Sequence, residues 1–502
     1  MINGNSSILF ILFIFLMACN AIPDKVRDTI SASSNKSELE KAIQHYQESG
    51  DKTKLKALYF LLEHIDYHQH RAGRAIENYK EVFNELATTP ESRKEWLEVI
   101  FDSLTAKRKD YNQGETFVVR DFNSLKAEDL IRHVDAAFVA WRSPWAEDMS
   151  FDEFSEYILP YKILEEEPDN WMANVQRSYD YLKLNTDDTY QACLIINDEL
   201  KRRFKIRSIP PFYDLNYSQL EKIKSGKCEH ATQYTAYVMR ALGVPVTVDY
   251  TYWGNMNGGH NWNALIYKGK SIPFVGSESD PGKTKIDLAR QRKRSKVFRY
   301  TYAIQKNELQ YLTQNTEEIP EVFRSYHTQD VTDQYIPVSD VAVNISPKEV
   351  ARYVYLCVFN KQTWFPVYWA TNSKNNTPLF KDMGRGIVYL PAKYESQQLL
   401  AIAPPFILLP NGGVKTLGAN SKQKRTVKIV KKSPHGPVIM KGNEYELFYW
   451  DSEWQSLGKQ MAMADSIMFH DVPDNTLLWV RSKDKSSNER PFIYIQDHQE
   501  WY

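Results

Sequence analysis

Residues 225–280 contain three kinds of side chain that can act together in catalysis. Cys228 follows Ser-Gly-Lys, His260 follows Gly-Gly, and two acids, Glu278 and Asp280, come after the histidine. A thiol is a strong nucleophile once it loses its proton, and both a helix N-terminus and a nearby imidazole favour the thiolate. A carboxylate can fix the tautomer and the orientation of such a histidine. This order of cysteine, histidine and acid predicts a thiol enzyme.

A helix is expected to begin at Cys228. Apolar side chains recur at helical spacing after it, Arg240 lies in the expected last turn, and Gly243 with Pro245 supplies the end. The thiol would therefore lie at the positive end of the helix dipole.

Three strands are expected to follow this helix. Residues 244–252 and 261–267 are rich in Val, Thr, Tyr and other residues that favour strands, so His260 would begin the second strand. Residues 271–275 form a shorter run that would return antiparallel to it. The third strand would then bring one of the two acids back toward the histidine.

Three short segments carry a resemblance to a known family. They read Ser-Gly-Lys-Cys-Glu-His-Ala, Arg-Ala-Leu-Gly-Val-Pro and Gly-His-Asn-Trp-Asn-Ala-Leu. Residues 220–281 thus resemble the core of the transglutaminase-like superfamily, which includes papain-fold thiol hydrolases and acyltransferases. The resemblance implies that Cys228 is the nucleophile, that His260 is the base and that an acid orients His260. The family usually has Asp-Pro-Thr after an aromatic residue, whereas this chain reads Phe-Val-Gly-Ser-Glu-Ser-Asp-Pro, so either Glu278 or Asp280 could be this acid.

A zinc site is the competing interpretation of the same residues. Cys228, His230 and His260 are all zinc-ligand types, but no CxxC pair and no HxxxH spacing accompanies them. His230 lies two residues after Cys228 and would point to another face of the helix. We therefore predict no metal and no cofactor, and a structural role for His230.

An acyl-transfer enzyme also needs hydrogen-bond donors for the oxyanion. One would be the main-chain N–H beside Cys228 at the helix start. Tyr217 and Gln219 are the nearest upstream side-chain candidates, and both could equally be ordinary residues of the preceding helix.

The N-terminus predicts export. Residues 8–17 form an apolar run that is too short to span a bilayer and fits the core of a signal peptide. The next residues complete Leu-Met-Ala-Cys19, which resembles the lipobox of bacterial lipoproteins and implies lipid attachment at Cys19. No Lys or Arg precedes the apolar run, so a cleaved signal without lipid is the alternative. Asn20 follows where an inner-membrane retention signal has Asp, so the outer membrane of the cell envelope is the expected location.

Composition sets limits on the rest of the chain. The 502 residues are 42% hydrophobic and 25% charged, which indicates several globular domains. The formal net charge is zero, and nothing in the charge pattern indicates nucleic-acid binding.

Three cysteines follow Cys19, namely Cys193, Cys228 and Cys357. Because three is an odd number, at least one of them cannot pair with another of the three in a disulfide. Cys193 and Cys357 lie in apolar runs and are expected to be buried.

The expected architecture is α+β with several domains. Helical spacing dominates from residue 37 to about residue 183, and short strand-like runs separated by turns dominate beyond residue 307, which favours β-sandwich modules. The predicted parts are a signal peptide (1–18), a helical region (19–183), a transglutaminase-like core (184–306), a β-sandwich module (307–424) and a second β module (425–502).

Two functions fit these patterns. The first is a lipid-anchored thiol hydrolase or acyltransferase that cleaves an amide bond in a peptide, peptidoglycan or glycopeptide substrate. The second is a noncatalytic envelope protein that uses the core as a scaffold and the β modules to bind glycan or protein. Tryptophans in the β modules could stack on sugars or could pack in the core. The five considered are Trp364, Trp369, Trp450, Trp454 and Trp479.

Overall fold

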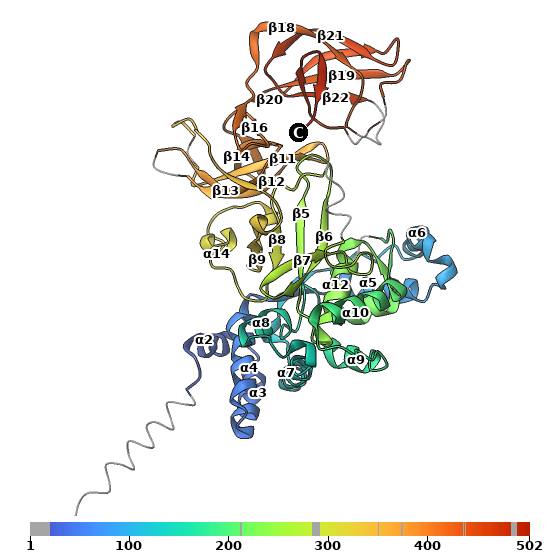
Figure 1. The fold of residues 1–502 in the computed structure, drawn as a ribbon, viewed down its shortest axis with the longest axis vertical. Helices are drawn as coiled ribbons and strands as arrows, with labels where there is room; N and C mark the ends of the chain where they lie inside the picture. Colours follow the sequence, from blue (N-terminus) through green and yellow to red (C-terminus); the bar gives the residue numbers. More distant parts are fainter. Residues whose placement is uncertain are drawn as a thin grey trace, which may run out of the picture. The chain divides into compact units, whose positions relative to one another are not determined.

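A computed structural model shows a chain that changes from helices to antiparallel strands along its length (Figure 1). It describes residues 21–210, 213–283, 292–349, 351–372, 375–434, 436, 438–482 and 489–502. Mixed helices and many antiparallel sheets confirm the α+β class.

The chain divides into two compact units, which we call the helical unit and the strand unit. The helical unit comprises Met1–Val248, Trp262–Thr284 and Tyr300–Ile304. The strand unit comprises Asp249–Asn261, Lys285–Arg299 and Gln305–Tyr502. The finer division into five parts stays a prediction.

Eleven α-helices are described in the helical unit. They are α2 (Asp24–Ala32), α3 (Lys36–Ser49), α4 (Lys52–His64), α5 (Arg74–Ala87), α6 (Leu97–Lys107), α7 (Ala127–Trp141), α8 (Phe151–Tyr157), α9 (Trp171–Ser178), α10 (Thr189–Arg203), α11 (Tyr217–Ile223) and α12 (Cys228–Ala241), with short 3-10 helices η1 (Ile65–Tyr67), η2 (Glu91–Trp96), η3 (Asp121–Asn123) and η4 (Pro144–Ala146). Most are amphipathic: α3 buries Leu39, Ala42, Ile43 and Tyr46, the spacing of a single helix face.

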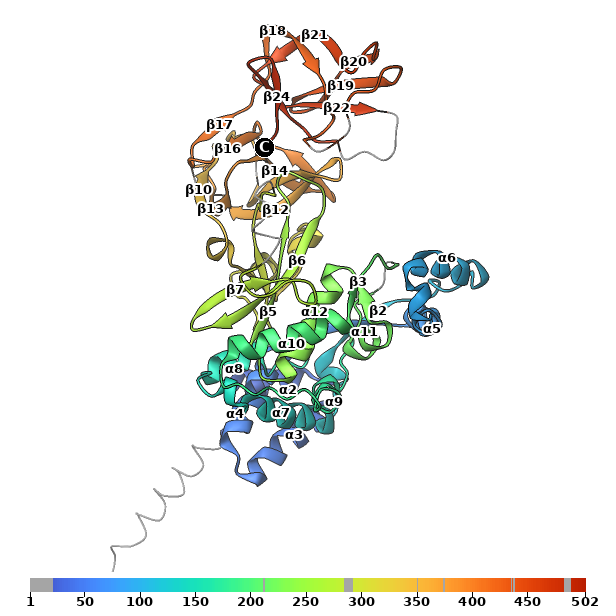
Figure 2. The same cartoon turned by 45° about the vertical axis from the view of Figure 1, so that its right-hand side comes forward.

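Helix α12 lies at the centre of the helical unit. Every residue from His230 to Ala241 is buried, whereas a surface helix buries a single stripe. Helices α9 and α10 lie beside it, and both contact it (Figure 2). The predicted helix from Cys228 is therefore confirmed, and its surroundings fix it as a rigid core element.

Short strands accompany these helices, and two of them, β5 (Val246–Tyr252) and β6 (Gly259–Tyr267), are divided between the helical unit and the strand unit. Strands β1 (Gln69–Ala72) and β2 (Phe117–Arg120) pair antiparallel, and β3 (Lys205–Ile206) pairs in parallel with β4 (Ser225–Gly226). Strands β5, β6 and β7 (Lys270–Phe274) are neighbours in the order β7-β6-β5, and β6 pairs antiparallel with β7. The three predicted strands are thus present. The pair β1 and β2 was not expected, because the sequence indicated only helices before residue 183.

The strand unit consists mainly of antiparallel sheets. Its elements are β8 (Phe298–Tyr300), α14 (Leu309–Thr313), η5 (Glu321–Phe323), β9 (Thr328–Asp330), η6 (Thr332–Gln334), β10 (Val338–Ala342), β11 (Tyr353–Asn360), β12 (Thr363–Thr371), β13 (Leu379–Gly384), β14 (Ile387–Glu395), β15 (Gln398–Ala401), β16 (Phe406–Leu408), β17 (Val414–Thr416), β18 (Asn420–Ile429), β19 (Glu444–Asp451), β20 (Glu453–Met461), β21 (Ile467–Asp474), β22 (Leu478–Ser482), β23 (Ile493–Ile495) and β24 (His498–Glu500). The largest sheet has the order β12-β11-β14-β16-β17, with β15 on β14, and another has the order β20-β19-β22.

Tryptophans of the strand unit pack on one another. Trp364, Trp454 and Trp479 surround Phe359 with ring centroids 5.2 to 5.8 Å from it, and Trp450 contacts Trp364 at 5.4 Å. Such edge contacts between aromatic rings are typical of a core. Trp369 packs edge-on against Tyr353 with centroids 5.7 Å apart, so all five tryptophans considered for sugar stacking make packing contacts.

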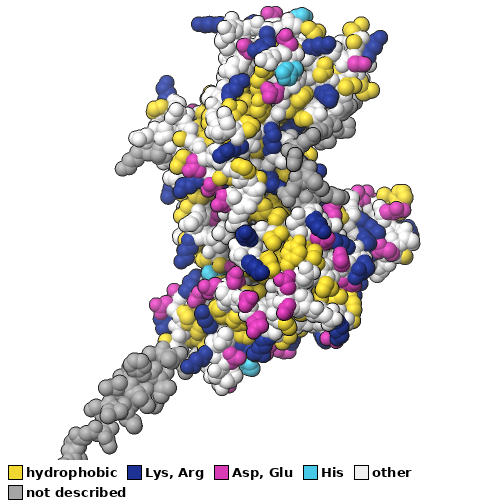
Figure 3. Space-filling model, in the orientation of Figure 1, with side chains coloured by type: hydrophobic (Ala, Val, Ile, Leu, Met, Phe, Trp, Pro, Cys, Tyr) yellow, Lys and Arg dark blue, Asp and Glu magenta, His cyan; other side chains and the backbone are white. Residues whose placement is uncertain are grey.

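On the face that Figure 3 shows, basic and acidic side chains are interspersed over both units. Cys19 and the predicted signal peptide lie outside the described residues. From residue 21 onward, with the gaps given above, no helix is long and apolar enough to cross a membrane.

Candidate active site

Cys228 is the first residue of α12. The segment before it is held by the β3–β4 pair, in which the N–H of Arg207 donates to the carbonyl oxygen of Gly226 at 2.8 Å. The first helical hydrogen bond runs from the N–H of Ala231 to the carbonyl oxygen of Lys227 at 3.0 Å. The N–H groups of the first turn have no partner within a helix, so the thiol sits where partial positive charge favours a thiolate.

His230 stabilises the start of this helix. Its Nδ1 accepts a hydrogen bond from the main-chain N–H of Lys227 at 3.3 Å. Burial, and then the charge of Lys227, lower the pKa of His230 to about 4, so the ring is neutral at neutral pH. Gly226 makes room for the ring, because a Cβ there would lie 2.5 Å from the Cβ of His230. The structural role predicted for His230 fits these contacts.

Cys228 differs from the other two cysteines that the structure describes. Cys193 and Cys357 are fully buried, and burial raises the pKa of both thiols. Cys228 is only partly buried, and none of the three forms a disulfide. Among these three, Cys228 is the thiol that a substrate can reach.

His260 is the second residue of β6 and belongs to the strand unit. Its ring stacks on Trp253, with centroids 6.1 Å apart and planes 19° apart. Burial, followed by the charges of Arg292 and Arg294, lowers the pKa of His260 to about 4. The imidazole is therefore neutral at neutral pH.

The turn between β5 and β6 is fixed within the strand unit. Asn360 accepts a hydrogen bond from the N–H of Gly258 at 2.8 Å and donates to its carbonyl oxygen at 2.9 Å. Arg490, which is 5% exposed, donates to the carbonyl oxygen of Gly254 at 2.8 Å and also to that of Phe359. Buried side chains thus hold the main chain that leads into His260.

Asn263 joins β6 to α12 inside the helical unit. Its Nδ2 donates to the carbonyl oxygen of Thr232 in α12 at 3.0 Å and to that of Thr247 in β5 at 2.9 Å. Asn263 is fully buried, so both bonds form in a medium of low dielectric. Our sequence reasoning missed this residue, although a polar residue within the apolar run of a strand is a detectable signal.

The segment after β7 is held by α10 and α12. Asn197 of α10 accepts a hydrogen bond from the N–H of Ser277 at 3.0 Å and donates to the carbonyl oxygen of Ser279 at 2.9 Å. A Cβ at Gly276 would lie 2.1 Å from Oγ1 of Thr235, so only glycine fits there. This packing fixes the main chain on which both candidate acids lie.

The two acids have different surroundings. Asp280 forms an ion pair with Lys201, and Asn197 donates to its Oδ1 at 3.2 Å. Burial opposes ionisation of Asp280, but Lys201 and Asn197 outweigh it and lower the pKa. Two residues of α10, Lys201 and Asn197, therefore already contact the carboxylate of Asp280. Glu278, in contrast, is exposed.

Neither upstream side chain considered for the oxyanion is simply exposed. Tyr217 is 3% exposed and stacks on Tyr234 with centroids 5.9 Å apart. The side-chain oxygen of Gln219 accepts a hydrogen bond from the N–H of Asn216 at 3.0 Å, which caps α11. Both side chains therefore have structural contacts.

The structure describes all four predicted catalytic residues, but in different units. Cys228, Glu278 and Asp280 belong to the helical unit, and His260 belongs to the strand unit. Their action together stays a prediction. Within the described ranges, no group of three or more His, Cys, Asp or Glu side chains is arranged to hold a metal ion.

No family model matches the chain, and no curated protein matches it. A solved structure from Cytophaga hutchinsonii, named "Putative Cysteine Protease", is similar over 28% of this chain and 51% of that chain, with 16% sequence identity and a TM-score of 0.23. The chain thus matches about half the length of that protein. A TM-score of this size does not establish a shared fold, so no residue role is transferred from it.

Proposed function

We propose that this protein is a cysteine-dependent hydrolase that cleaves an amide bond in a peptide, peptidoglycan or glycopeptide. One observation carries the proposal: Cys228 begins a buried 14-residue helix and is the only described cysteine that reaches solvent. A thiol at that position has the helix N-terminus to stabilise its anion.

The reaction would proceed in two halves. His260 takes the proton of the Cys228 thiol, and the sulfur attacks the amide carbon to form a tetrahedral oxyanion. When the C–N bond breaks, the leaving amine takes the proton from His260 and a thioester remains on Cys228. Water then gives a proton to His260 and attacks the thioester, which releases the acid and restores the thiol. Main-chain N–H groups at the start of α12 would stabilise both oxyanions.

We propose Glu278 as the acid that orients His260. Asn263 in β6 pairs with Phe274 in β7. His260 lies three residues before Asn263 in β6, and Glu278 follows β7 in a turn in which its N–H donates to the carbonyl oxygen of Val275 at 3.0 Å. Asp280 is the weaker candidate, because Lys201 and Asn197 already engage its carboxylate.

The proposed location is the cell envelope, with a lipid on Cys19 as the anchor. This part of the proposal is supported by the lipobox-like Leu-Met-Ala-Cys and the apolar run before it.

The pH dependence of iodoacetamide alkylation at Cys228 tests the proposal. In the intact chain we expect alkylation to continue well below the ordinary thiol pKa, and we expect His260→Ala to shift the profile upward by about one pH unit or more. His45→Ala, which alters an exposed histidine of α3, is the matched control and should leave the profile unchanged. An ordinary thiol profile that His260→Ala does not alter would overturn the proposal and favour the noncatalytic scaffold.

A further inference from the structure

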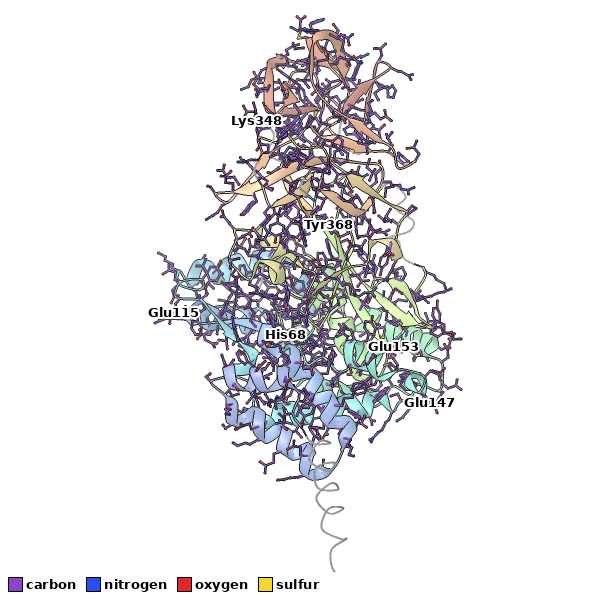
Figure 4. All side chains as sticks on the ribbon, turned by 90° about the vertical axis from the view of Figure 1, so that its left-hand side faces the viewer. His68, Glu115, Glu147, Glu153, Lys348 and Tyr368 are labelled. Atoms are coloured by element: carbon purple, nitrogen blue, oxygen red, sulfur yellow. The ribbon has the colours of Figure 1, made fainter. Side chains whose placement is uncertain are left out.

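A cavity of about 250 Å³ lies in the helical unit, and it does not include any of the predicted catalytic residues. Strand β1 and helix α5 form part of its wall, and Glu165, Glu167, Tyr213 and Asp214 form another part. Figure 4 labels His68, which immediately precedes β1. The lining residues include His70, Arg71, Tyr79, Glu165, Tyr213 and Asp214.

A buried charge network orients His70 toward a ligand. Nδ1 of His70 lies 2.7 Å from Oδ1 of Asp121, which also accepts hydrogen bonds from Lys162 and Tyr161, both at 2.8 Å through Oδ2. Burial opposes ionisation of Asp121, but Lys162 and the hydrogen bonds outweigh it and lower the pKa. An ionised carboxylate can only accept, so Nδ1 of His70 is the donor and Nε2 carries the lone pair in the neutral ring.

The second nitrogen of His70 is left for a ligand. His70 is 9% exposed and lines the cavity, and within the described residues its Nε2 has no hydrogen-bond partner. Nε2 of His70 is not sealed inside the protein but is open to the cavity. An acceptor held in place by Asp121 and open to a cavity is therefore suited to a ligand that donates a hydrogen bond.

Charges of both signs line the same cavity without ion-pair partners. In the part of the chain that the structure describes, Arg71, Glu165 and Asp214 form no ion pair, whereas Lys80 is paired with Glu167 at 2.8 Å. Surrounding protein, and then the charges of Glu166 and Glu165, raise the pKa of Asp214 to about 6, although its side chain reaches solvent. A bound cation would relieve this repulsion, and Arg71 offers a fork for a carboxylate.

We propose that this cavity binds a zwitterionic α-amino acid group. Its ammonium donates to Nε2 of His70 and to the carboxylates of Glu165 and Asp214, and its carboxylate pairs with Arg71. Tyr79 and Tyr213, whose ring centroids are 5.3 Å apart, form an aromatic wall that suits the carbon atoms of the ligand and the ammonium. This site goes beyond the proposed hydrolase activity and does not depend on it.

Three matched probes test the site in the full-length chain by isothermal titration calorimetry. L-Alanine carries both charges, ethylamine lacks the carboxylate, and propionate lacks the ammonium. We expect L-alanine to bind at least about tenfold more tightly than either of the others, because each loses one charge-assisted contact. No binding of L-alanine at millimolar concentration, or equal binding of all three probes, would overturn the proposal.

Variants assign each charge to a side chain. Arg71→Gln should lower the affinity for L-alanine about tenfold and change the affinity for ethylamine by less than about twofold. Asp214→Asn should lower the affinity for both probes. Both residues are exposed, so these variants should fold. Arg177→Gln, an exposed arginine of α9 outside the cavity, is the matched control and should change nothing. Unchanged L-alanine binding in Arg71→Gln or in Asp214→Asn would overturn the assignment.

Discussion

The amide of Asn263 in β6 donates to the main-chain oxygen of Thr232 in α12 at 3.0 Å, one helical turn after Cys228. The same amide reaches Thr247 in β5, so one buried side chain joins the helix that begins at the thiol to two strands. This link therefore couples the position of α12 to the part of β6 that lies in the helical unit.

The first prediction concerns Asn263. Asn263→Leu should destabilise the helical unit by about 2 to 4 kcal/mol, because it leaves two buried carbonyl oxygens without their donors. Urea unfolding followed by circular dichroism measures the change. Asn84→Leu, at an exposed position of α5, should cost under about 0.5 kcal/mol. Equal effects of the two substitutions would show that the buried amide is dispensable.

The second prediction concerns the contact between Gly226 and His230. Gly226→Ala should cost about 2 kcal/mol or more, since the new Cβ would lie 2.5 Å from the Cβ of His230. Gly418→Ala, where nothing lies within 4 Å, is the matched control. The double variant with Gly226→Ala and His230→Gly should lose less stability than the sum of the losses in the two single variants, because the clash is absent from it. Additive costs in this double-mutant cycle would contradict the predicted contact.

The third prediction concerns the order in which cysteines react. Under native conditions, iodoacetamide should label Cys228 roughly a hundredfold faster than Cys193 or Cys357, because both of these are buried and their thiol pKa values are raised. Peptide mapping by mass spectrometry measures the three rates. In denaturing urea the rates should converge. Native labelling of Cys193 as fast as that of Cys228 would contradict the burial seen here.

The fourth prediction concerns pH. The pKa of His230 falls from 6.5 to about 4 on folding, so the unfolded chain binds more protons between these values. The contribution of His230 to the free energy of unfolding is therefore fully present above about pH 6.5. Roughly 2 to 3 kcal/mol of this free energy is lost as the pH falls to about 4. His230→Gln should remove this part of the pH dependence, whereas His45→Gln should not. Parallel stability curves for the wild type and His230→Gln would contradict the assigned shift.

Some elements could not be predicted from the sequence. Strand β20 has no strand pattern in its sequence, because Glu-Trp-Gln-Ser-Leu-Gly-Lys-Gln-Met is mostly polar and exposed and lacks the alternation typical of a half-buried strand. Strands β1 and β2 were missed because each has only four residues among helices. Strands β1 and β2 form by pairing with each other although a long segment separates them, and β20 forms by pairing with β19 in a hairpin. Local composition encodes neither pairing.

Local periodicity in the sequence determined the helix that begins at Cys228, the strand that begins next to His260 and the antiparallel return of β7, because the spacing of apolar residues follows from each element's own geometry. Only the tertiary structure decided the partners of the polar groups. Asp280 forms an ion pair with Lys201, and His70 forms a hydrogen bond with Asp121 beside a cavity. These contacts join residues dozens of positions apart, so they depend on how the elements pack and not on any spacing along the chain.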